Sequence, residues 1–257
     1  MLIYKQAMAQ TRPKTRLYTP QDLSAGRVIV FDRPQSAYLI KVMRLRPGAE
    51  VGLFNGEDGE WRAQLAIAGS RAVEAVIQTQ LCLPEPKTGP TLAFVPLKKA
   101  PMEWLLTKAT ELGVARFQPL ITDFGQAQAL PKEDRLATLL QEAAEQCERC
   151  TVPEVRPPQH FGPWLEGAER VLAAVEAGEA LDARAWMQAP GVVPDQLLIG
   201  PEGGFSGAEL AALAGHPGVI CLNLGARILR AETAGLSLLT LAQVASGEFM
   251  GRPSFRS

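Results

Sequence analysis

The 257-residue chain has few of the side chains that most often hold metals or carry out acid–base chemistry: two histidines and four cysteines. His160 and His216 leave little material for a metal site or a histidine base. The cysteines are too few and too scattered for a disulfide framework or a paired zinc site. Cys147 and Cys150 form a Cys-x-x-Cys pair, but they fall at the end of a helical run, where residues three apart share a face. We therefore expect no metal cofactor.

Long apolar runs and targeting patterns are also missing. No run is long enough to span a bilayer, and Lys5, Arg12, Lys14 and Arg16 interrupt any signal-peptide pattern at the start. These absences predict a cytoplasmic chain with no membrane partner. Neither Gly-x-Gly-x-x-Gly after a strand nor Gly-x-x-x-x-Gly-Lys-Ser/Thr occurs, so an enzyme that cradles nucleotide phosphates is disfavoured.

The net charge of −1 hides an uneven distribution of charge. The first 46 residues contain nine lysines and arginines and two aspartates, so this segment carries +7 and the remainder carries −8. A basic lobe can bind a polyanion, because neutralising phosphates releases counterions. A solvated basic face would have the same composition, so the charge count leaves both interpretations open.

The first third of the chain predicts a small β domain. Residues 1–15 are polar and aperiodic, which indicates a disordered lead. From residue 16 to residue 82, short β-type runs are separated by turns, with strong turn signals at Asn55-Gly56 and Asp58-Gly59. The runs are Val28–Phe31, Val51–Gly56, Trp61–Ile67 and Val73–Ile77. A small β-barrel is the expected fold.

A proline-rich linker separates this domain from the rest. Residues 83–90 contain three prolines and a glycine. From residue 91 to residue 257, strand patterns alternate with helical patterns, beginning with Thr91–Pro96, Met102–Gly113 and Phe117–Ile121. Alternation of this kind predicts an α/β domain with a parallel sheet and crossover helices.

The densest signal lies in residues 196–245, where two apolar strands each meet a tight turn and then a helix. The first turn holds three glycines within residues 200–204. It leads to Ser206, three residues before Glu209, which is the spacing of a capping box that begins a helix. The second turn contains Gly225 and leads into an apolar run that ends at Ala245.

Two such turns predict a small-molecule site. In an open parallel sheet, ligands bind beyond the carboxyl ends of the strands, where glycine lets the main chain approach closely. Glycine is common in the strand-to-helix turns of any α/β domain, so a single turn would mean little. The second turn, however, is followed within seven residues by Arg227, Arg230, Glu232 and Thr233. The pair of turns therefore favours a binding site.

Two motifs carry a resemblance to a known family. Leu198-Ile-Gly-Pro-Glu-Gly-Gly-Phe-Ser and Leu224-Gly-Ala-Arg-Ile-Leu-Arg-Ala-Glu-Thr-Ala resemble the signature of the RsmE family, the 16S ribosomal RNA uracil-N3 methyltransferases of the SPOUT class. The resemblance spans residues 16–250 and implies an enzyme that forms 3-methyluridine in the small ribosomal subunit. It also implies a SPOUT-like C-terminal domain with a trefoil knot, working as a homodimer. Periodicity alone does not show a knot, and knotted chains are rare.

The resemblance implies S-adenosyl-L-methionine as the cofactor, bound by the backbone of both turns. From the first turn, the implied residues are Leu198, Ile199, Gly200, Pro201, Glu202 and Gly203. From the second turn, they are Leu222, Leu224, Gly225, Ile228, Leu229, Arg230, Thr233 and Ala234.

The N-terminal domain is similar to the family's PUA-like RNA-binding module. Val42–Arg46 resembles a Val-Leu-Arg-hydrophobic-basic element. Tyr38 stands where relatives usually have a histidine, so it can stack on a base but does not titrate near neutrality. The residues expected to bind RNA are Arg16, Lys41, Arg44, Arg46 and Arg227.

Two further segments depart from the family's pattern, although the blocks around Lys98-Lys99 and Glu145–Arg149 follow it. The segment Thr122–Gln128 lacks the arginine and serine that relatives commonly carry after this strand, and Thr151 replaces a frequent basic residue. Some contact with the substrate is therefore expected to be weaker or to come from elsewhere.

The chemistry implied by the resemblance fits the shortage of histidine and cysteine. Methyl transfer from a sulfonium needs the acceptor nitrogen in line with the methyl group and free of its proton, without a covalent enzyme intermediate. An arginine near the uracil oxygens would stabilise the anion as it forms. Arg230 is the first candidate and Arg149 the second, while Arg227 could instead bind phosphate. Glu232 could orient an arginine or accept a proton, and a structural salt bridge is the alternative for each of them.

A non-catalytic RNA-binding or ribosome-assembly factor is the competing interpretation. Such a protein would use the same barrel and the same basic lobe. It would not require paired glycine turns at two strand ends. The sequence therefore favours the enzyme over the binding module.

Overall fold

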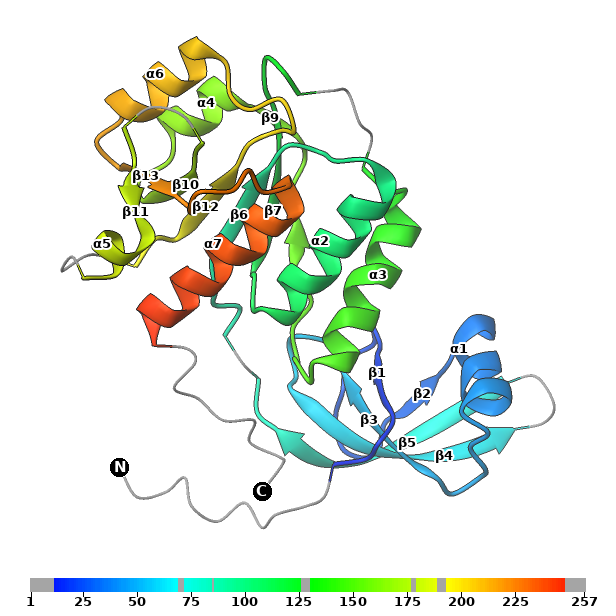
Figure 1. The fold of residues 1–257 in the computed structure, drawn as a ribbon. Helices are drawn as coiled ribbons and strands as arrows, with labels where there is room; N and C mark the ends of the chain where they lie inside the picture. Colours follow the sequence, from blue (N-terminus) through cyan, green and yellow to red (C-terminus); the bar gives the residue numbers. More distant parts are fainter. Residues whose placement is uncertain are drawn as a thin grey trace, which may run out of the picture. The chain divides into compact units, whose positions relative to one another are not determined.

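The computed structural model describes residues 12–68, 72–84, 86–125, 130–176, 179–188 and 193–247, drawn in colour in Figure 1. They form two compact units. The first contains the described residues up to Lys87 together with Cys147–Thr151, and the second contains the described residues of Thr88–Gln146 and those from Val152 to Gly247. A short segment from the second half of the sequence is thus part of the N-terminal unit.

The N-terminal unit is built on a five-stranded sheet in the order β1-β3-β4-β5-β2. Its strands are β1 (Arg16–Tyr18), β2 (Val28–Val30), β3 (Glu50–Phe54), β4 (Glu60–Ala68) and β5 (Ala72–Cys82). All pairings are antiparallel except that of β1 with β3. Two short helices, α1 (Arg33–Ala37) and the π-helix η1 (Tyr38–Val42), follow β2. The predicted PUA-like barrel takes the form of a half-barrel (Figure 1).

The local sequence explains this sheet. Val73, Ala75 and Ile77 alternate with more exposed residues along β5 and point into the core, as expected for a strand with one buried face. The predicted turn between β3 and β4 is fastened by Asn55, whose Oδ1 accepts hydrogen bonds from the backbone N–H groups of residues 57 and 58 at 2.9 and 2.8 Å. Gly59 has φ +78°, and a Cβ there would lie 2.1 Å from a backbone oxygen, so only glycine fits.

A fully buried carboxylate, Glu60, lies at the centre of the N-terminal unit's polar contacts. Its Oε2 lies 2.8 Å from Arg12 Nη2 and 2.9 Å from Arg16 Nη2, and its side chain is 0% exposed. Arg16 Nη2 also donates to the backbone oxygen of Arg149 at 3.0 Å, and Cys150 Sγ lies 3.6 Å from Glu60 Oε2. These contacts attach residues 147–151 to the N-terminal unit.

Arg16 was expected to bind RNA, but the structure places it inside this cluster. Burial acts to lower the pKa of Arg16, yet its hydrogen bonds to Glu60 and the charge of that carboxylate outweigh burial, so the pKa is raised. Residues 1–11 of the predicted lead lie outside the described residues. Thr15, near its end, is buried and accepts a hydrogen bond from Gly52 N at 2.9 Å.

The second unit is an α/β domain with an eight-stranded sheet. The sheet order is β11-β13-β10-β12-β6-β7-β8, with β9 paired to β7, and every pairing is parallel. Its strands are β6 (Thr91–Phe94), β7 (Arg116–Ile121), β8 (Glu154–Val155), β9 (Gln159–His160), β10 (Val171–Ala174), β11 (Leu181–Asp182), β12 (Gln196–Ile199) and β13 (Val219–Asn223). Its helices are α2 (Lys99–Glu111), α3 (Glu133–Gln146), α4 (Phe161–Glu166), α5 (Ala183–Gln188), α6 (Gly207–Gly215) and α7 (Ala231–Ser246). This arrangement confirms the predicted parallel α/β domain.

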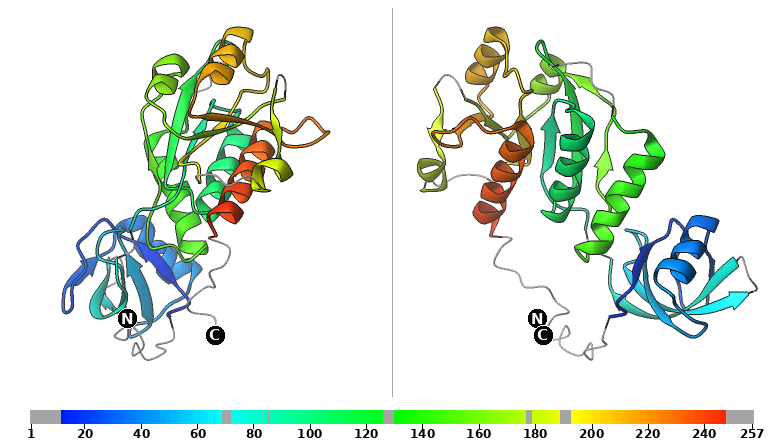
Figure 2. Two further views of the ribbon diagram at one scale, coloured as in Figure 1. Left: turned by 90° about the vertical axis from the view of Figure 1, so that its left-hand side faces the viewer. Right: turned by 45° about the vertical axis from the view of Figure 1, so that its right-hand side comes forward.

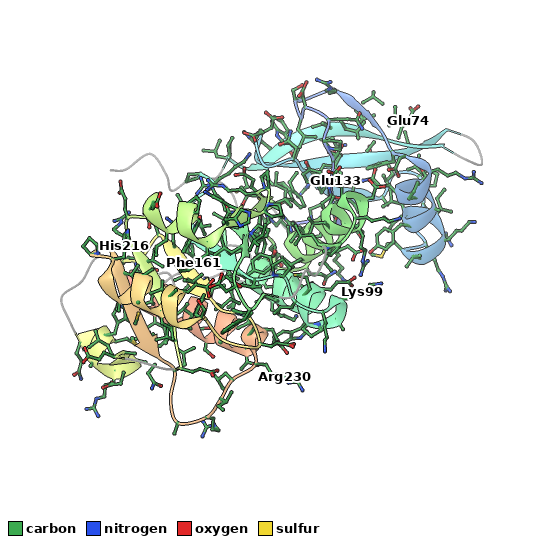
Figure 3. The ribbon with its side chains drawn as sticks, turned by 90° about the horizontal axis from the view of Figure 1, so that it is seen from above. Glu74, Lys99, Glu133, Phe161, His216 and Arg230 are labelled. Carbon is green, nitrogen blue, oxygen red and sulfur yellow. The ribbon has the colours of Figure 1, made fainter. Side chains whose placement is uncertain are left out.

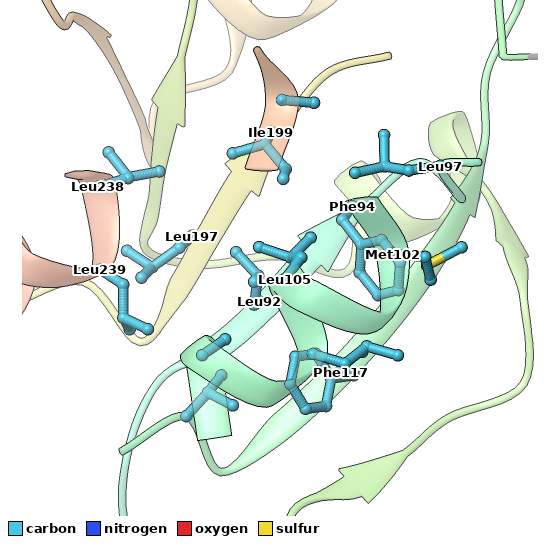
Figure 4. Packing of buried hydrophobic residues seen from close by; sticks show 14 of the residues in the cluster. Leu92, Phe94, Leu97, Met102, Leu105, Phe117, Leu197, Ile199, Leu238 and Leu239 are labelled. Atoms are coloured by element: carbon cyan, nitrogen blue, oxygen red, sulfur yellow. The ribbon is translucent and has the colours of Figure 1, made fainter. Parts of the chain in front are cut away.

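Helices cover both faces of this sheet. Figures 1 and 2 show α2, α3 and α7 on one face and α4 and α6 on the other. The strands bury side chains on both faces, as parallel sheets do. In β12, for example, Leu197 and Ile199 pack with α2 and α7, whereas Leu198 packs with α4 and α6. Figure 4 shows the first of these two cores.

Helix α7 buries its apolar face within its own unit. Leu238 and Leu239 are fully buried, and Leu236 packs partly buried against the same core. Gly235 allows the close approach, because a Cβ there would lie 3.0 Å from Leu105 and 3.1 Å from Ile199. Among the described residues of this helix, Val244 is the large apolar side chain that remains exposed, at 43%. The hydrophobicity of this helix therefore has an explanation inside the chain and does not by itself require a dimer.

The resemblance also implies a trefoil knot, and the sequence predicts no membrane-spanning segment. The order of the strands does not define how the chain is threaded, so the trefoil knot stays a prediction. Among the helices that the structure describes, none is both long enough and apolar enough to cross a membrane.

We predict that Glu60→Gln will lower the free energy of unfolding by about 3–5 kcal/mol, since it removes the carboxylate that faces two buried guanidinium groups while keeping the shape of the side chain. Urea unfolding followed by circular dichroism measures the change.

Glu57→Gln is the matched control, because the ion pair of Glu57 with Lys87 is exposed and contributes little. A Glu60→Gln variant as stable as this control would contradict the importance of the buried cluster.

Candidate functional site

A cavity of about 890 Å³ lies at the carboxyl ends of three neighbouring strands, β10, β12 and β13. Its wall consists mainly of the two glycine turns, residues 199–205 and 223–231. Small-molecule and cofactor sites typically have volumes of roughly 300–1,000 Å³. The cavity therefore has the size and the location of a ligand site in an open parallel sheet.

The register of the strands explains why the two turns meet. Ala174 at the end of β10 is aligned with Ile199 of β12 on one side and with Leu222 of β13 on the other. Because the strands are parallel and end at the same level, the turns that follow them open on the same edge of the sheet. Two turns with 17 residues between them in the sequence (206–222) thus form one wall.

The turn after β12 depends on its glycines. A Cβ on Gly200 would lie 2.9 Å from the ring of Phe205, so this position admits no side chain without a shift of the ring. Gly204 has φ +71° and its N–H donates to Pro201 O at 2.9 Å, which closes the turn. Ser206 then caps α6, with both hydrogen bonds of the predicted capping box present.

The turn after β13 is shaped by Asn223 and Gly225. The side-chain oxygen of Asn223 accepts a hydrogen bond from Gly225 N at 2.7 Å, and Gly225 has φ +111°. The turn ends at Arg230, the N-cap residue of α7. The positive end of the α7 dipole therefore faces the cavity, whose wall includes Ala231 and Ala234.

Most of the residues that the sequence predicts for the cofactor lie on the cavity wall. Those on the wall are Ile199, Gly200, Pro201, Glu202, Gly203, Leu224, Gly225, Ile228, Leu229, Arg230 and Ala234. Leu198 and Leu222 are instead fully buried in the two cores, because alternate residues of a strand face opposite sides of the sheet. Thr233 lies exposed on α7 and is not part of the wall.

The end of β10 is the part of the wall that sequence reasoning missed. Ala174, Val175 and Glu176 contribute to the cavity, and so does Lys98 at the start of α2. No glycine follows β10 directly, so the glycine pattern did not indicate that this strand end belongs to the site. The available signal was the apolar run Val171–Val175 followed by Glu176, since an apolar run that gives way to a charged residue is typical of the end of a buried strand.

Charged side chains of both signs surround the cavity. Lys98, Arg227 and Arg230 are exposed on its wall together with the carboxylates Glu176 and Glu202. Figure 3 labels Arg230 beside the loop that follows β13. In the described part of the chain, Arg230 makes no ion pair, so its guanidinium is available to a ligand.

The other predicted catalytic residues are placed differently. Glu232 lies in the first turn of α7, outside the cavity wall. Arg149 belongs to the N-terminal unit, where its backbone oxygen is held by Arg16 and its Nη2 donates to Thr151 Oγ1 at 3.3 Å. The two arginines proposed for catalysis, Arg149 and Arg230, thus belong to different compact units.

The predicted RNA-binding residues of the N-terminal unit other than Arg16 are exposed. Lys41 lies in the π-helix η1, and Arg44 and Arg46 follow it. The same helix leaves Tyr38 39% and Val42 66% exposed. Arg44 has φ +53°, an unfavourable conformation for a residue with a side chain. Backbone strain and π-helical turns often occur at functional sites.

The described residues contain no cluster of three or more His, Cys, Asp or Glu side chains that could hold a metal ion.

The fold and the cavity place the chain in a class of proteins. The family described as RNA methyltransferase domain matches residues 84–243, and the family described as RNA methyltransferase PUA domain matches residues 31–78. The parallel α/β domain with its strand-end cavity, preceded by the PUA-like half-barrel, is thus the architecture of an RNA methyltransferase.

Curated proteins that are similar to this chain identify one family within the RNA methyltransferases. The chain is 34% identical over 240 residues to ribosomal RNA small subunit methyltransferase E of Synechocystis sp., covering 89% of this chain and 76% of the relative. It is 30% identical over 232 residues to the protein of the same name from Rickettsia conorii, covering 89% and 94%. The chain belongs to this family, the RsmE family, as its two motifs predict.

Two solved structures are similar over nearly their whole length. A methyltransferase from Legionella pneumophila, in complex with the cofactor SAM, is 30% identical, with a TM-score of 0.76 over 90% of this chain and 97% of that one. A ribosomal RNA small subunit methyltransferase E from Neisseria gonorrhoeae, bound to S-adenosyl methionine, is 26% identical, with a TM-score of 0.75 over 90% and 97%. The PUA-like and SPOUT-like fold classes are therefore confirmed.

Proposed function

We propose that this chain methylates N3 of a uridine in the 16S ribosomal RNA of the small subunit, with S-adenosyl-L-methionine as the methyl donor. The observation that carries the proposal is the cavity at three aligned strand ends, walled by two glycine turns. Membership in the RsmE family and two SAM-bound neighbours support the cofactor and the RNA substrate. A binding module without catalysis would leave this cavity without a role.

The residues of the cavity fit the cofactor. Gly200, Gly203 and Gly225 expose bare backbone that a nucleoside and an amino-acid moiety can approach closely. The N-terminus of α7 favours a carboxylate, and Glu202 or Glu176 favours a positively charged centre. When bound, the cofactor supplies a methyl group on a positively charged sulfur, which departs as a thioether while the new N3–C bond forms.

The side chains of this chain act on the acceptor base. The uracil ring loses its N3 proton, and the resulting negative charge spreads over two carbonyl oxygens. Arg230, exposed on the wall without an ion pair among the described residues, stabilises that charge as it develops. Arg149 remains the second candidate for this role, and Glu232 the candidate for orienting an arginine or accepting the proton. Arg227, exposed on the same wall, binds the RNA backbone.

The surface around η1 binds RNA, with Lys41, Arg44 and Arg46 contacting phosphates. Tyr38, on the same surface, offers a ring on which a base can stack. The acidic remainder of the chain makes this basic surface the better site for a polyanion. Because the proposed substrate is ribosomal RNA, we also propose that the chain acts in the cytoplasm.

Gly203→Val should abolish binding of S-adenosyl-L-methionine while leaving the fold intact. A Cβ at Gly203 would meet only Phe124 Cβ at 3.6 Å, an ordinary contact, but a branched side chain there would project from the cavity wall. Calorimetry measures the affinity. Gly207→Val, in open space outside the wall, is the matched control. Unchanged affinity in Gly203→Val would count decisively against this site.

Arg230→Ala should lower the turnover rate by about 10²-fold to 10³-fold with little change in cofactor affinity, the usual effect of losing one donor to a developing anion. Single-turnover methylation at saturating RNA measures the rate, and mass spectrometry of the digested RNA must show 3-methyluridine. If Arg230 anchors phosphate instead, the Michaelis constant for RNA will rise and turnover will survive. Methyl on ribose or on carbon 5 would overturn the substrate assignment.

Replacing both Arg44 and Arg46 with glutamine should weaken RNA binding and reduce the slope of log affinity against log salt by up to about two, because each lost phosphate contact removes about one released counterion. Binding to small-subunit RNA at several salt concentrations gives the slope. Arg170→Gln, in the other unit and paired with Asp195, is the control. A double variant with the slope of the wild type would refute this surface.

The active form is proposed to be a homodimer. Ile228, 87% exposed in the turn that forms part of the cavity wall, is a large apolar side chain that a second copy would cover. Sedimentation should show a dimer at micromolar concentration, and Ile228→Asp should shift the population toward monomer. A wild-type chain that sediments only as a monomer would exclude the dimer.

A further inference from the structure

A second, smaller pocket of about 100 Å³ adjoins the cavity. It shares Lys98 and the turn residues 201–203 with the cavity wall and adds Pro96, Leu97 and Phe124 of its own. This volume is smaller than the roughly 150 Å³ cavity that holds a benzene molecule, so the pocket has room for part of a single planar ring and is too small for a nucleotide. Its position beside the proposed methyl-donor site is the position that an acceptor base requires.

Phe124 is the unusual residue of this pocket. Its side chain is 56% exposed although it belongs to a domain with two well-filled cores. Its Cβ lies 3.6 Å from the point where a Cβ on Gly203 would be, so Phe124 adjoins the glycine turn of the cavity and lines the pocket together with it. It occupies the segment that departs from the family's pattern, Thr122–Gln128, whose residues 126–128 lie outside the described part of the chain.

The backbone that carries Phe124 is tightly held. Asp123 N donates to Glu209 Oε1 at 2.9 Å, and Ser206 Oγ donates to Asp123 Oδ2 at 2.6 Å. Ser206 and Glu209 are themselves buried and form the capping box of α6. The loop after β7 is thereby fastened to the same helix cap that ends the first glycine turn. An exposed aromatic ring on a fixed backbone is a rigid platform for stacking.

Lys98 and Glu202 are the two charged side chains of the pocket, and Lys98 is its cation. It is the N-cap residue of α2, makes no side-chain capping hydrogen bond, and is exposed where the pocket and the cavity meet. Its ammonium group and the positive end of α2 favour negative charge at this junction. A uracil carbonyl oxygen becomes more negative when N3 loses its proton, and a cation placed there stabilises the change.

We propose that this pocket receives the acceptor base, with Phe124 stacking on the uracil ring and Lys98 contacting a carbonyl oxygen of the same ring. Aromatic stacking is the common means by which proteins hold an unstacked base. The inference rests on the proposed function and assigns the recognition of the base to two residues that the two motifs do not contain.

The test uses the full chain with S-adenosyl-L-methionine and small subunits that lack the methyl group. Phe124→Ala should raise the Michaelis constant for RNA about 10-fold to 100-fold with cofactor affinity unchanged, whereas Phe124→Trp should retain the wild-type value. Lys98→Met should lower turnover about 10²-fold, and Lys98→Arg should restore much of it. Trp104→Ala removes an equally exposed aromatic ring outside both pockets and should have no effect.

The outcomes distinguish a failure of the proposed methyltransferase function from a failure of the base-binding role of Phe124. A wild-type chain that forms no 3-methyluridine removes the proposed function and this inference together. An active wild type with a normal Michaelis constant in Phe124→Ala removes only the stacking role. Equal losses in Phe124→Ala and Phe124→Trp, or a loss of cofactor affinity in either, would show that Phe124 shapes the cavity and would overturn the inference as well.

Discussion

The site depends on one geometric constraint, the in-register alignment of β10, β12 and β13. Backbone hydrogen bonds between parallel strands fix this register, and the apolar side chains of both sheet faces hold it against α2 and α7 on one side and α4 and α6 on the other. A shift of one residue in β12 would exchange Leu198 with its neighbours between the two cores, so the register is strongly specified. The two glycine turns meet only because these strands end at the same level.

The N-terminal unit has a comparable centre in Glu60, a carboxylate that reaches Arg12 and Arg16 without contact with solvent. Buried ion pairs contribute little net stability but are costly to break, so this one fixes a particular arrangement more than it strengthens the fold. Here it binds residues 147–151, including Arg149, to the sheet. The basic surface around η1 is separate from it, since Lys41, Arg44 and Arg46 are exposed where Arg16 is enclosed.

Positioning explains how a chain with so little histidine and cysteine can serve as an enzyme. Under the proposed mechanism, bare backbone at glycine, a helix N-terminus and exposed cations at the cavity supply the alignment and the charge stabilisation that methyl transfer needs in place of a nucleophile. Lys98 is the N-cap residue of α2, whereas Arg227 and Arg230 lie in the turn between β13 and α7, and the sheet brings these two segments to one edge.

The sequence by itself determined the class of each unit and the centre of the site. Short β-type runs between turn signals indicated the strands of the N-terminal sheet, strand and helix patterns indicated the parallel α/β domain, and glycine with the Ser206–Glu209 spacing located the turns, because these signals depend on local backbone geometry. Tertiary structure decided what local pattern does not encode. It directed the side chains of Leu198 and Leu222 toward the two cores, because strand side chains alternate between the faces of the sheet. It enclosed Arg16 with Glu60, a partner 44 residues away, and it brought β10, Lys98 and Phe124 to the site, because contacts between distant segments arise only when the whole sheet is assembled.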